Sequence, residues 1–453
     1  MDIDDLDYRV RAQSGCIPPQ LVARLLELGR SDAVESWAGR GEWFCAREWA
    51  RLLAGDGRPA EALEVLAPYP AAGWWPAAEA RAELLEASGR SDEAIALVRP
   101  HAQDGERPAL GFLARLLSRH GRAEEAFTLL RPHIGDWSLA EAFVDIAGTI
   151  GRDEEAAELL VRRIEDTPRC CDSPSCDGRR KVEPFNAVGL LATIRERQGR
   201  VDDAVALLRT RESTSVNNRD QLADLLARHG RIEELRAYAA TDHHGHATQR
   251  LAELLEERGD VEGAVAAYRQ AADPAAGDPN AAYALAQFLV RHGRGDEAIE
   301  VMRAQTDARP YEDWILHTFA DLCLDQGRAQ DGLAHLDDLK ARRGGEEEWE
   351  LFWMRLPLIA AAAGVDEAVE HARAHPEGGT WYAVAHVAWL LARSGRTEEV
   401  VAVLDRNEPA HRRDLAGHLI DLGRIDDAVA LLRQHDPRPP ALRTGTWHDE
   451  PPF

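Results

Sequence analysis

Residues 121–130, GRAEEAFTLL, are one copy of a short phrase that recurs along the whole chain. The phrase begins with Gly-Arg, continues with acids and a small residue, and ends in an apolar run. Other copies are GRPAEALEVL from Gly57, GRSDEAIALV from Gly89, GRVDDAVALL from Gly199 and GRIDDAVALL from Gly423. A unit repeated in this way indicates a stacked helical solenoid rather than a compact catalytic globule.

The spacing of the recurrent glycine sets the size of the unit. The twelve intervals between Gly29 and Gly423 average about 33 residues, which is the length of helix–turn–helix repeats. The thirteen glycines are Gly29, Gly57, Gly89, Gly121, Gly151, Gly199, Gly230, Gly259, Gly293, Gly327, Gly364, Gly395 and Gly423.

Each unit predicts a helical hairpin from its own residues. A segment such as LARLLSRH, residues 113–120, has apolar residues at helical spacing, and the following glycine can end that helix in the left-handed conformation. Acids such as Glu124 and Glu125 then fall in the first turn of a second helix and complement its positive end. Because the turn is so short, the two helices must pack antiparallel.

Small residues at fixed positions predict close packing of these helices. Alanine usually stands seven residues before the glycine and again five residues after it, and a larger apolar residue follows nine after it. The preceding alanines are Ala50, Ala82, Ala114, Ala192, Ala223, Ala252, Ala286, Ala320, Ala388 and Ala416. The following alanines are Ala62, Ala94, Ala126, Ala156, Ala204, Ala264, Ala298 and Ala428, and Leu235, Gly332 and Val400 replace the alanine elsewhere.

The pattern resembles the tetratricopeptide repeat (TPR) family over roughly residues 16–436. The best matching positions are Ala252, Leu255, Gly259, Ala264, Tyr268 and Ala271, followed in the next unit by Ala286, Leu289, Gly293, Ala298 and Met302. The resemblance implies an all-α, right-handed superhelical solenoid of about thirteen helix–turn–helix repeats, with the first helices lining a concave groove. The early aromatic residue of the family's first helix is mostly missing, and the unit at Gly364 is one residue short in its turn.

Irregular stretches divide the solenoid into predicted segments. We expect one solenoid part at residues 1–165, a loop insertion at 166–185, the second solenoid part at 186–436 and a Pro-rich tail at 437–453. No polar capping helix is evident after the last unit. Its apolar end is expected to be covered by the tail, by Trp447 or by a second copy of the chain.

Charge and hydropathy narrow the classes of partner and the compartment. The chain has 54 basic and 79 acidic residues, a formal charge of −25, which disfavours nucleic acid as a partner. Residues 1–15 lack the apolar core of a secretory signal, and no apolar run approaches membrane-spanning length. These features predict a cytoplasmic protein that binds neither nucleic acid nor membrane. Six cysteines in 453 residues do not predict a disulfide framework, and no motif predicts a cofactor.

Two clusters raise the question of a metal site. Cys170, Cys171 and Cys176 lie in the predicted insertion, where they can bind zinc or act as a redox sensor, or can be incidental residues of a surface loop. The spacing C-C-x4-C differs from a two-pair zinc knuckle. His243, His244 and His246 lie in an inter-repeat turn without a fixed carboxylate or cysteine partner, which favours a solvated loop over a metal site.

Arginines and aromatic residues are the candidate contacts of the groove. Arginines two residues before the turn glycine can clamp a carboxylate or a peptide C-terminus, or can simply complement the helix end and pair with an acid of a neighbouring repeat. Exposed aromatic residues in phase with them can be anchors for a partner, or can fill the space between repeats. The arginines are Arg119, Arg197, Arg228, Arg291 and Arg393, and the aromatic residues are Phe44, Tyr283, Trp314, Tyr382 and Trp389.

These patterns favour a non-catalytic scaffold that binds a protein or a peptide. The sequence contains no Gly-rich phosphate loop, no HExxH pair and no GxSxG elbow, and its paired acids recur at the helix-capping place of nearly every unit. One alternative is a regulator that senses a ligand or metal through the groove or the cysteine loop. A third hypothesis is an enzyme built on helical hairpins, which a deep closed cavity would favour. The oligomeric state is left open.

Overall fold

A computed structural model describes most of the chain. The described residues are 3–69, 73–166, 186–211, 215–216, 219–242, 245–273, 277–345, 349–404 and 408–434. The predicted cysteine insertion and the Pro-rich tail therefore lie outside them, apart from Asp166, the last residue of a helix.

Most of the described residues are helical, as the sequence predicted. The α-helices are α1 (Ile3–Ala12), α2 (Pro19–Glu27), α3 (Ser31–Gly39), α4 (Trp43–Gly55), α5 (Pro59–Leu66), α6 (Trp75–Ala87), α7 (Ser91–Gln103), α8 (Arg107–Arg119), α9 (Ala123–Leu130), α10 (Trp137–Thr149), α11 (Asp153–Asp166), α12 (Ala187–Arg197), α13 (Val201–Leu208), α14 (Gln221–Arg228), α15 (Ile232–Ala239), α16 (His246–Glu257), α17 (Val261–Ala271), α18 (Pro279–Arg291), α19 (Gly295–Ala308), α20 (Asp313–Asp325), α21 (Ala329–Arg342), α22 (Trp349–Ala363), α23 (Val365–Ala374), α24 (Trp381–Arg393), α25 (Thr397–Val403), α26 (Arg412–Asp421) and α27 (Ile425–Leu432). Two short 3-10 helices, η2 (Arg131–His133) and η3 (Pro409–His411), and a two-stranded antiparallel ribbon, β1 (Ser215–Val216) and β2 (Arg219–Asp220), complete the list.

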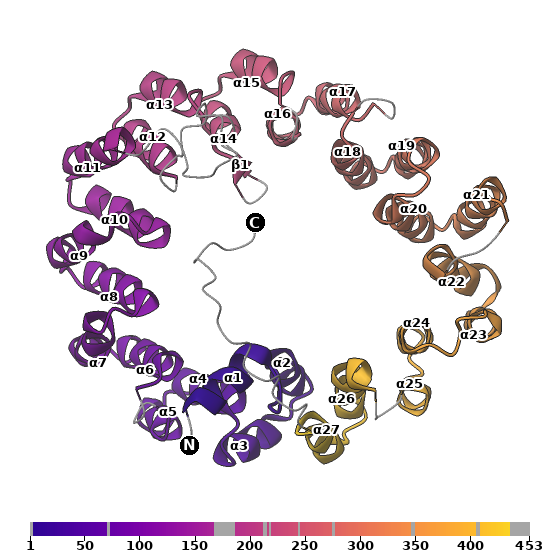
Figure 1. The fold of residues 1–453 in the computed structure, drawn as a ribbon, viewed down its shortest axis with the longest axis horizontal. Helices are drawn as coiled ribbons and strands as arrows, with labels where there is room; N and C mark the ends of the chain where they lie inside the picture. The colour runs from indigo at the N-terminus through magenta and orange to yellow at the C-terminus, as the bar shows by residue number, and fades with distance from the viewer. Residues whose placement is uncertain are drawn as a thin grey trace, which may run out of the picture. The chain divides into compact units, whose positions relative to one another are not determined.

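Helices α2 to α27 form thirteen consecutive hairpins, one around each recurrent glycine (Figure 1). Twelve of these glycines have φ between 64° and 81°, which confirms the left-handed helix ends predicted from the sequence. Gly364 differs, with φ 111° and ψ 157°, because its turn is one residue shorter and the glycine directly precedes α23. The chain is therefore an all-α solenoid of TPR-like hairpins.

The arginine after the glycine has two roles in the turn, which explains why Gly-Arg begins the repeated phrase. In the turn at Gly89, the Arg90 amide donates to the Leu85 carbonyl at 2.8 Å, which closes a Schellman motif at the end of α6. The Arg90 side chain then donates to Glu93 in the first turn of α7, at 2.7 and 2.6 Å. One residue thus ends the first helix and supports the start of the second.

The predicted small positions are confirmed in the core. The alanines before and after the turn glycines are at most 4% exposed, and the larger apolar residues that follow, such as Leu66, Tyr268 and Met302, are also buried. Leu235 and Val400 are fully buried replacements for the small residue. A Cβ at Gly332 would lie 3.0 Å from the Cβ of Cys323, so the helices approach even more closely there.

The helices form two compact units. Unit 1 comprises residues 1–109 and 376–453, and unit 2 comprises residues 110–375. These boundaries cross the two solenoid segments predicted from the sequence, and the predicted segment limits themselves stay a prediction. In unit 1, helix α2 packs against α26, although the two lie at opposite ends of the chain.

Charged side chains hold this contact inside unit 1. Arg24 on α2 donates to Asp421 on α26 at 2.7 Å. The Glu42 carboxylate, only 3% exposed, accepts from Arg433 at 2.6 and 3.1 Å and from the Ile17 amide at 3.3 Å. The last repeat is thus packed on the first helices of the chain, a contact that the sequence did not predict.

In unit 2, the first and second helices of the hairpins form different surfaces. First helices of successive repeats pack side by side, as α14 does with α16 and α16 with α18, whereas no two described second helices of neighbouring repeats pack as closely. The first helices accordingly lie on the inner side of the arc of helices within this unit (Figure 1). The residues on the face of these first helices that points away from the second helices therefore line the predicted groove.

Candidate functional site

A groove between first helices α16 and α18 of unit 2 is a candidate site on the inner surface. Its volume is about 720 Å³. Its lining is mainly polar and consists of Gly245, His246, Gln249, Glu253, Tyr268, Asp278, Asn280, Ala281, Tyr283, Ala284, Gln287 and Arg291. Such a groove presents both hydrogen-bonding groups and an aromatic ring to a partner.

Helix periodicity brings the lining residues together. Tyr283, Gln287 and Arg291 follow one another at four-residue intervals on α18, so they share one face of the helix. Gln249 and Glu253 form the matching row on α16, with a hydrogen bond of 3.1 Å between them. Tyr283 keeps 42% of its surface exposed and can therefore contact a partner.

Arg291 has an acidic partner on the preceding repeat. Its Nη2 donates to Glu256 at 3.3 Å, and the adjacent His292 contacts the same carboxylate at 2.8 Å. The guanidinium also lies 5.5 Å from the ring centre of Phe288. Arg291 is therefore held in place at the end of the groove by a carboxylate and an aromatic ring of the scaffold itself.

The same three-residue arrangement recurs two junctions earlier in unit 2, between α12 and α14. Glu196 accepts from Arg228 at 3.0 and 2.8 Å and contacts His229 at 2.9 Å. Partial burial opposes ionisation of Glu196, but the hydrogen bonds from Arg228 and His229 outweigh it and lower the pKa of this carboxyl. The sequence repeats the residue types again at Glu86, Arg119 and His120, and Arg119 is itself engaged in an interaction.

Two other arginines of the predicted ladder are also held by the scaffold. Arg197 pairs with Asp153 and donates to the Val144 carbonyl at 3.0 Å. Its guanidinium occupies the space that a Cβ at Gly148 would fill. Arg393 lies over the ring of Trp389, 4.9 Å from its centre. The ladder arginines thus have structural partners, and their role in binding stays a prediction.

The predicted aromatic residues are in different environments. Tyr283, Trp314 and Trp389 are exposed, and their role as anchors in the groove stays a prediction. Tyr382 is half-buried and its hydroxyl donates to Glu377. Phe44 was predicted to point into the groove, but this is wrong: it is buried in the core of unit 1, where α4 packs against its neighbours.

The candidate metal ligands receive no structural support. Cys170, Cys171, Cys176, His243 and His244 lie outside the described residues. His246 is described and lines the groove on α16. Among the described parts of the chain, no group of His, Cys, Asp or Glu side chains is arranged to hold a metal ion.

Three cysteines lie in the described part of the chain. Cys16, Cys45 and Cys323 are buried free thiols, and burial raises their pKa to about 11, 12 and 11, so they stay protonated at neutral pH. Within the described ranges, every helix is too short or too polar to span a bilayer.

Sequence reasoning missed the amide and carboxylate residues of the groove. Gln249, Glu253, Asn280 and Gln287 drew no attention because polar residues on a helix surface are common. The signal that could have identified them is their position in the repeat. Four-residue spacing from Tyr283 and Arg291 places Gln287 on the predicted inner face, and the alignment of repeats places Gln249 opposite.

Comparison with known families supports the repeat type. A family model described as anaphase-promoting complex, cyclosome, subunit 3, which is TPR-like, matches residues 257–339. The chain is also 25% identical over 263 residues to cellulose synthase operon protein C of Pseudomonas fluorescens (strain SBW25). That match spans 56% of this chain but only 17% of the bacterial relative. TPR-like repeats generally serve as scaffolds for protein interactions.

Solved structures of similar chains come from protein complexes. One is a chain from the structure of Naa15/Naa10 bound to HypK-THB, with a TM-score of 0.33 and 12% identity, covering 85% of this chain and 67% of that one. Another is from the APC/C hetero-tetramer Cut9-Hcn1, with a TM-score of 0.24 and 11% identity, covering 86% of this chain and 92% of that one.

Proposed function

We propose that this protein is a non-catalytic scaffold that binds a segment of another protein, or a peptide, along the first helices of its repeats. The observation that carries the proposal is the groove between α16 and α18, with its exposed Tyr283 and its rows of amide and charged side chains. A long inner surface with polar rows suits a partner that lies across several repeats, and no bond-making step is required.

The groove chemistry supports a peptide as the occupant. Gln249, Asn280 and Gln287 each carry both donors and acceptors, which match the amides and carbonyls of an extended backbone. Tyr283 offers a large rigid contact surface of the kind found at binding hot spots. An exposed ion pair such as Arg291–Glu256 is worth only about 0–1 kcal/mol, so a carboxylate of the partner can compete for Arg291.

Partner capture from native cells tests this proposal. The variant Tyr283→Ala/Arg291→Glu removes the aromatic contact and reverses the charge at the groove. Proteins retained by the wild-type chain are identified by mass spectrometry, and the dissociation constant of each purified candidate is then measured. We expect the double variant to lose at least tenfold in affinity for the partner bound by the groove.

The matched control carries the same types of substitution at exposed positions away from the groove. Tyr311→Ala/Arg162→Glu alters an exposed aromatic residue and an exposed arginine that do not line it. Retention of the partner by this control supports the groove as the site. Equal capture by wild type and by Tyr283→Ala/Arg291→Glu rejects the proposal.

A further inference from the structure

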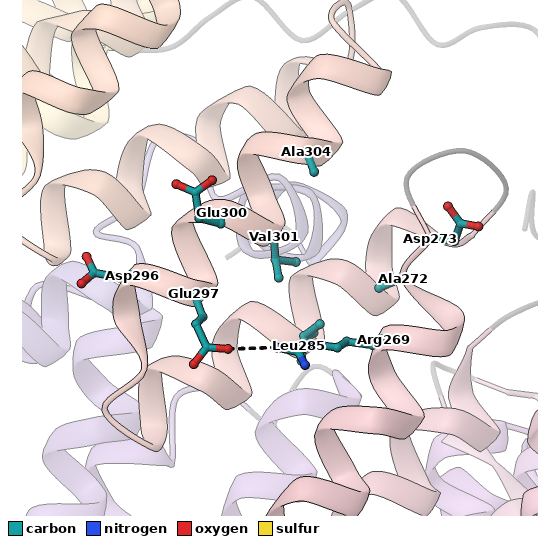
Figure 2. Close-up of a pocket in the computed structure, with 9 residues that line it drawn as sticks. All are labelled: Arg269, Ala272, Asp273, Leu285, Asp296, Glu297, Glu300, Val301 and Ala304. Atoms are coloured by element: carbon teal, nitrogen blue, oxygen red, sulfur yellow. Dashed lines mark hydrogen bonds and ion pairs between the residues drawn. The ribbon is translucent and has the colours of Figure 1, made fainter.

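A second groove of unit 2 lies between second helices, away from the rows on the first helices. It is bounded by α17 and α19 and has a volume of about 490 Å³ (Figure 2). Leu285, only 1% exposed, contributes from α18, and Ala272, Val301 and Ala304 supply the other apolar contacts. This groove sits where two successive hairpins meet.

Carboxylates surround these apolar residues. Asp296, Glu297 and Glu300 come from α19, and Asp273 follows the end of α17. Arg269 is the basic residue of the lining, and it already donates to Glu297 at 2.9 Å. The lining therefore holds four acids and one base around an apolar centre.

Arginines outside the lining pair with three of its four acids. Arg294 donates to Glu297 at 2.6 and 2.8 Å, Arg303 reaches Glu300 at 3.2 Å and Arg328 pairs with Asp296, but none of these three arginines lines the groove. The Glu300 and Asp296 side chains remain 66% and 83% exposed. Ion pairs as exposed as those of Glu300 and Asp296 contribute little to stability, so an incoming cation can share or replace the arginine.

We infer that this second-helix groove is a separate docking site for a basic amphipathic helix of a protein partner. Apolar side chains on one face of that helix would contact Val301 and Ala304, which lie beside the buried Leu285, and flanking Lys or Arg residues would pair with Glu300 and Asp273. A furrow between two helices accepts a third helix by the usual helix-in-groove mode. The net charge of −25 attracts a basic segment and opposes a second copy of this acidic chain.

A defined peptide tests this site on the full-length chain. The probe is a fluorescently labelled 14-residue amphipathic helix of Leu, Ala, Lys and Arg, with its leucines on one face. Its dissociation constant is measured by fluorescence anisotropy at two salt concentrations. We expect micromolar binding that weakens severalfold at high salt and at least tenfold when the leucines are replaced by glutamine.

Two variants separate the apolar and the charged contributions. Ala304→Trp fills the groove and leaves every acid in place, so a tenfold loss cannot come from changed charge. Glu300→Gln should weaken binding severalfold. Glu158→Gln is the matched control, because Glu158 is 67% exposed and also pairs with an arginine of its own helix, Arg162.

Three results would overturn the inference. The first is no binding of the probe at micromolar concentration. The second is equal binding by wild type and Ala304→Trp, or equal losses in Glu300→Gln and Glu158→Gln, which would mean unspecific attraction to an acidic surface. The third is self-association of the wild type that Ala304→Trp abolishes, which would assign the groove to a second copy of the chain.

Discussion

The junctions between repeats in unit 2 and the contact between the two ends of the chain in unit 1 are built by different rules. In unit 2 the partners are about one repeat apart, as in Arg294, which reaches both Glu297 of its own hairpin and Glu262 of the preceding one. In unit 1 the Arg433–Glu42 pair joins residues 391 positions apart. A contact that recurs at every junction can be encoded by a repeated sequence motif, whereas a contact that is made once leaves no repeat to recognise.

The energetic character of the two contacts differs as well. The repeat junctions use exposed ion pairs that tie neighbouring second helices at their starts: Arg152–Glu124, Arg231–Asp202, Arg294–Glu262 and Arg328–Asp296. The end contact uses a buried carboxylate, Glu42, that is paired with Arg433. Loss of one exposed pair should be tolerated, but loss of the partner of a buried charge should not.

The largest expected effect comes from Arg433→Met. It leaves the buried Glu42 carboxylate, at the start of α4, without its cation at the end of α27, which should cost about 3 kcal/mol and loosen the nearby packing of α2 on α26. Hydrogen exchange should accelerate in both helices and stay unchanged in α18. The control Arg24→Met breaks a more exposed pair of the same contact and should cost much less. Equal exchange in wild type and Arg433→Met would show that the ends do not depend on this pair.

A close helix approach inside a regular repeat should give the next effect. Ala252→Leu places three extra carbons at a fully buried position of α16, which should destabilise unit 2 by about 2 kcal/mol. Ala266→Leu, on the exposed side of α17, should change the free energy of unfolding little. Chemical denaturation compares the two. A stable Ala252→Leu variant would mean that the repeats can separate without loss.

Strain at a single turn should be smaller. Gly121 has φ 75°, where an added Cβ meets no neighbour but the left-handed backbone is unfavourable, so Gly121→Ala should cost about 1 kcal/mol. Gly55 is an ordinary helical glycine with equal free space, and Gly55→Ala should be neutral or stabilising. Thermal unfolding of both variants checks this. Identical shifts would contradict the turn assignment.

The smallest expected effect is on the pH dependence of stability. The pKa of Glu196 is lower in the folded state than in the unfolded chain, so the ionised carboxylate stabilises the fold above about pH 4.3 and this contribution is lost as the pH falls through the folded value. Arg228→Met/His229→Gln removes the cause of the shift. The variant should therefore lose less thermal stability between pH 7 and pH 3.5 than wild type. Arg162→Met is the control, and equal pH slopes in all three proteins would refute the linkage.

The site was predictable only in part. Tyr283 and Arg291 followed from helical phase, because residues four apart share a face wherever the helix lies. Phe44 obeyed the same phase and is nevertheless buried, since the aromatic residues of α4 pack into the core of unit 1. Phase gives the direction of a side chain within its own helix and says nothing about what lies beyond it.

The repeats themselves were determined by the residues of each unit. A glycine that tolerates positive φ, an arginine beside it, acids at the next helix start and alanines at matched positions all act within one hairpin or between neighbours, so a single sequence reveals them. Only the tertiary structure decided that α26 packs on α2 and that Glu42 is buried beside Arg433. It also decided that one groove forms between the first helices α16 and α18 and another between the second helices α17 and α19. These features depend on how the hairpins pack against one another in space, and no local pattern of residues encodes that packing.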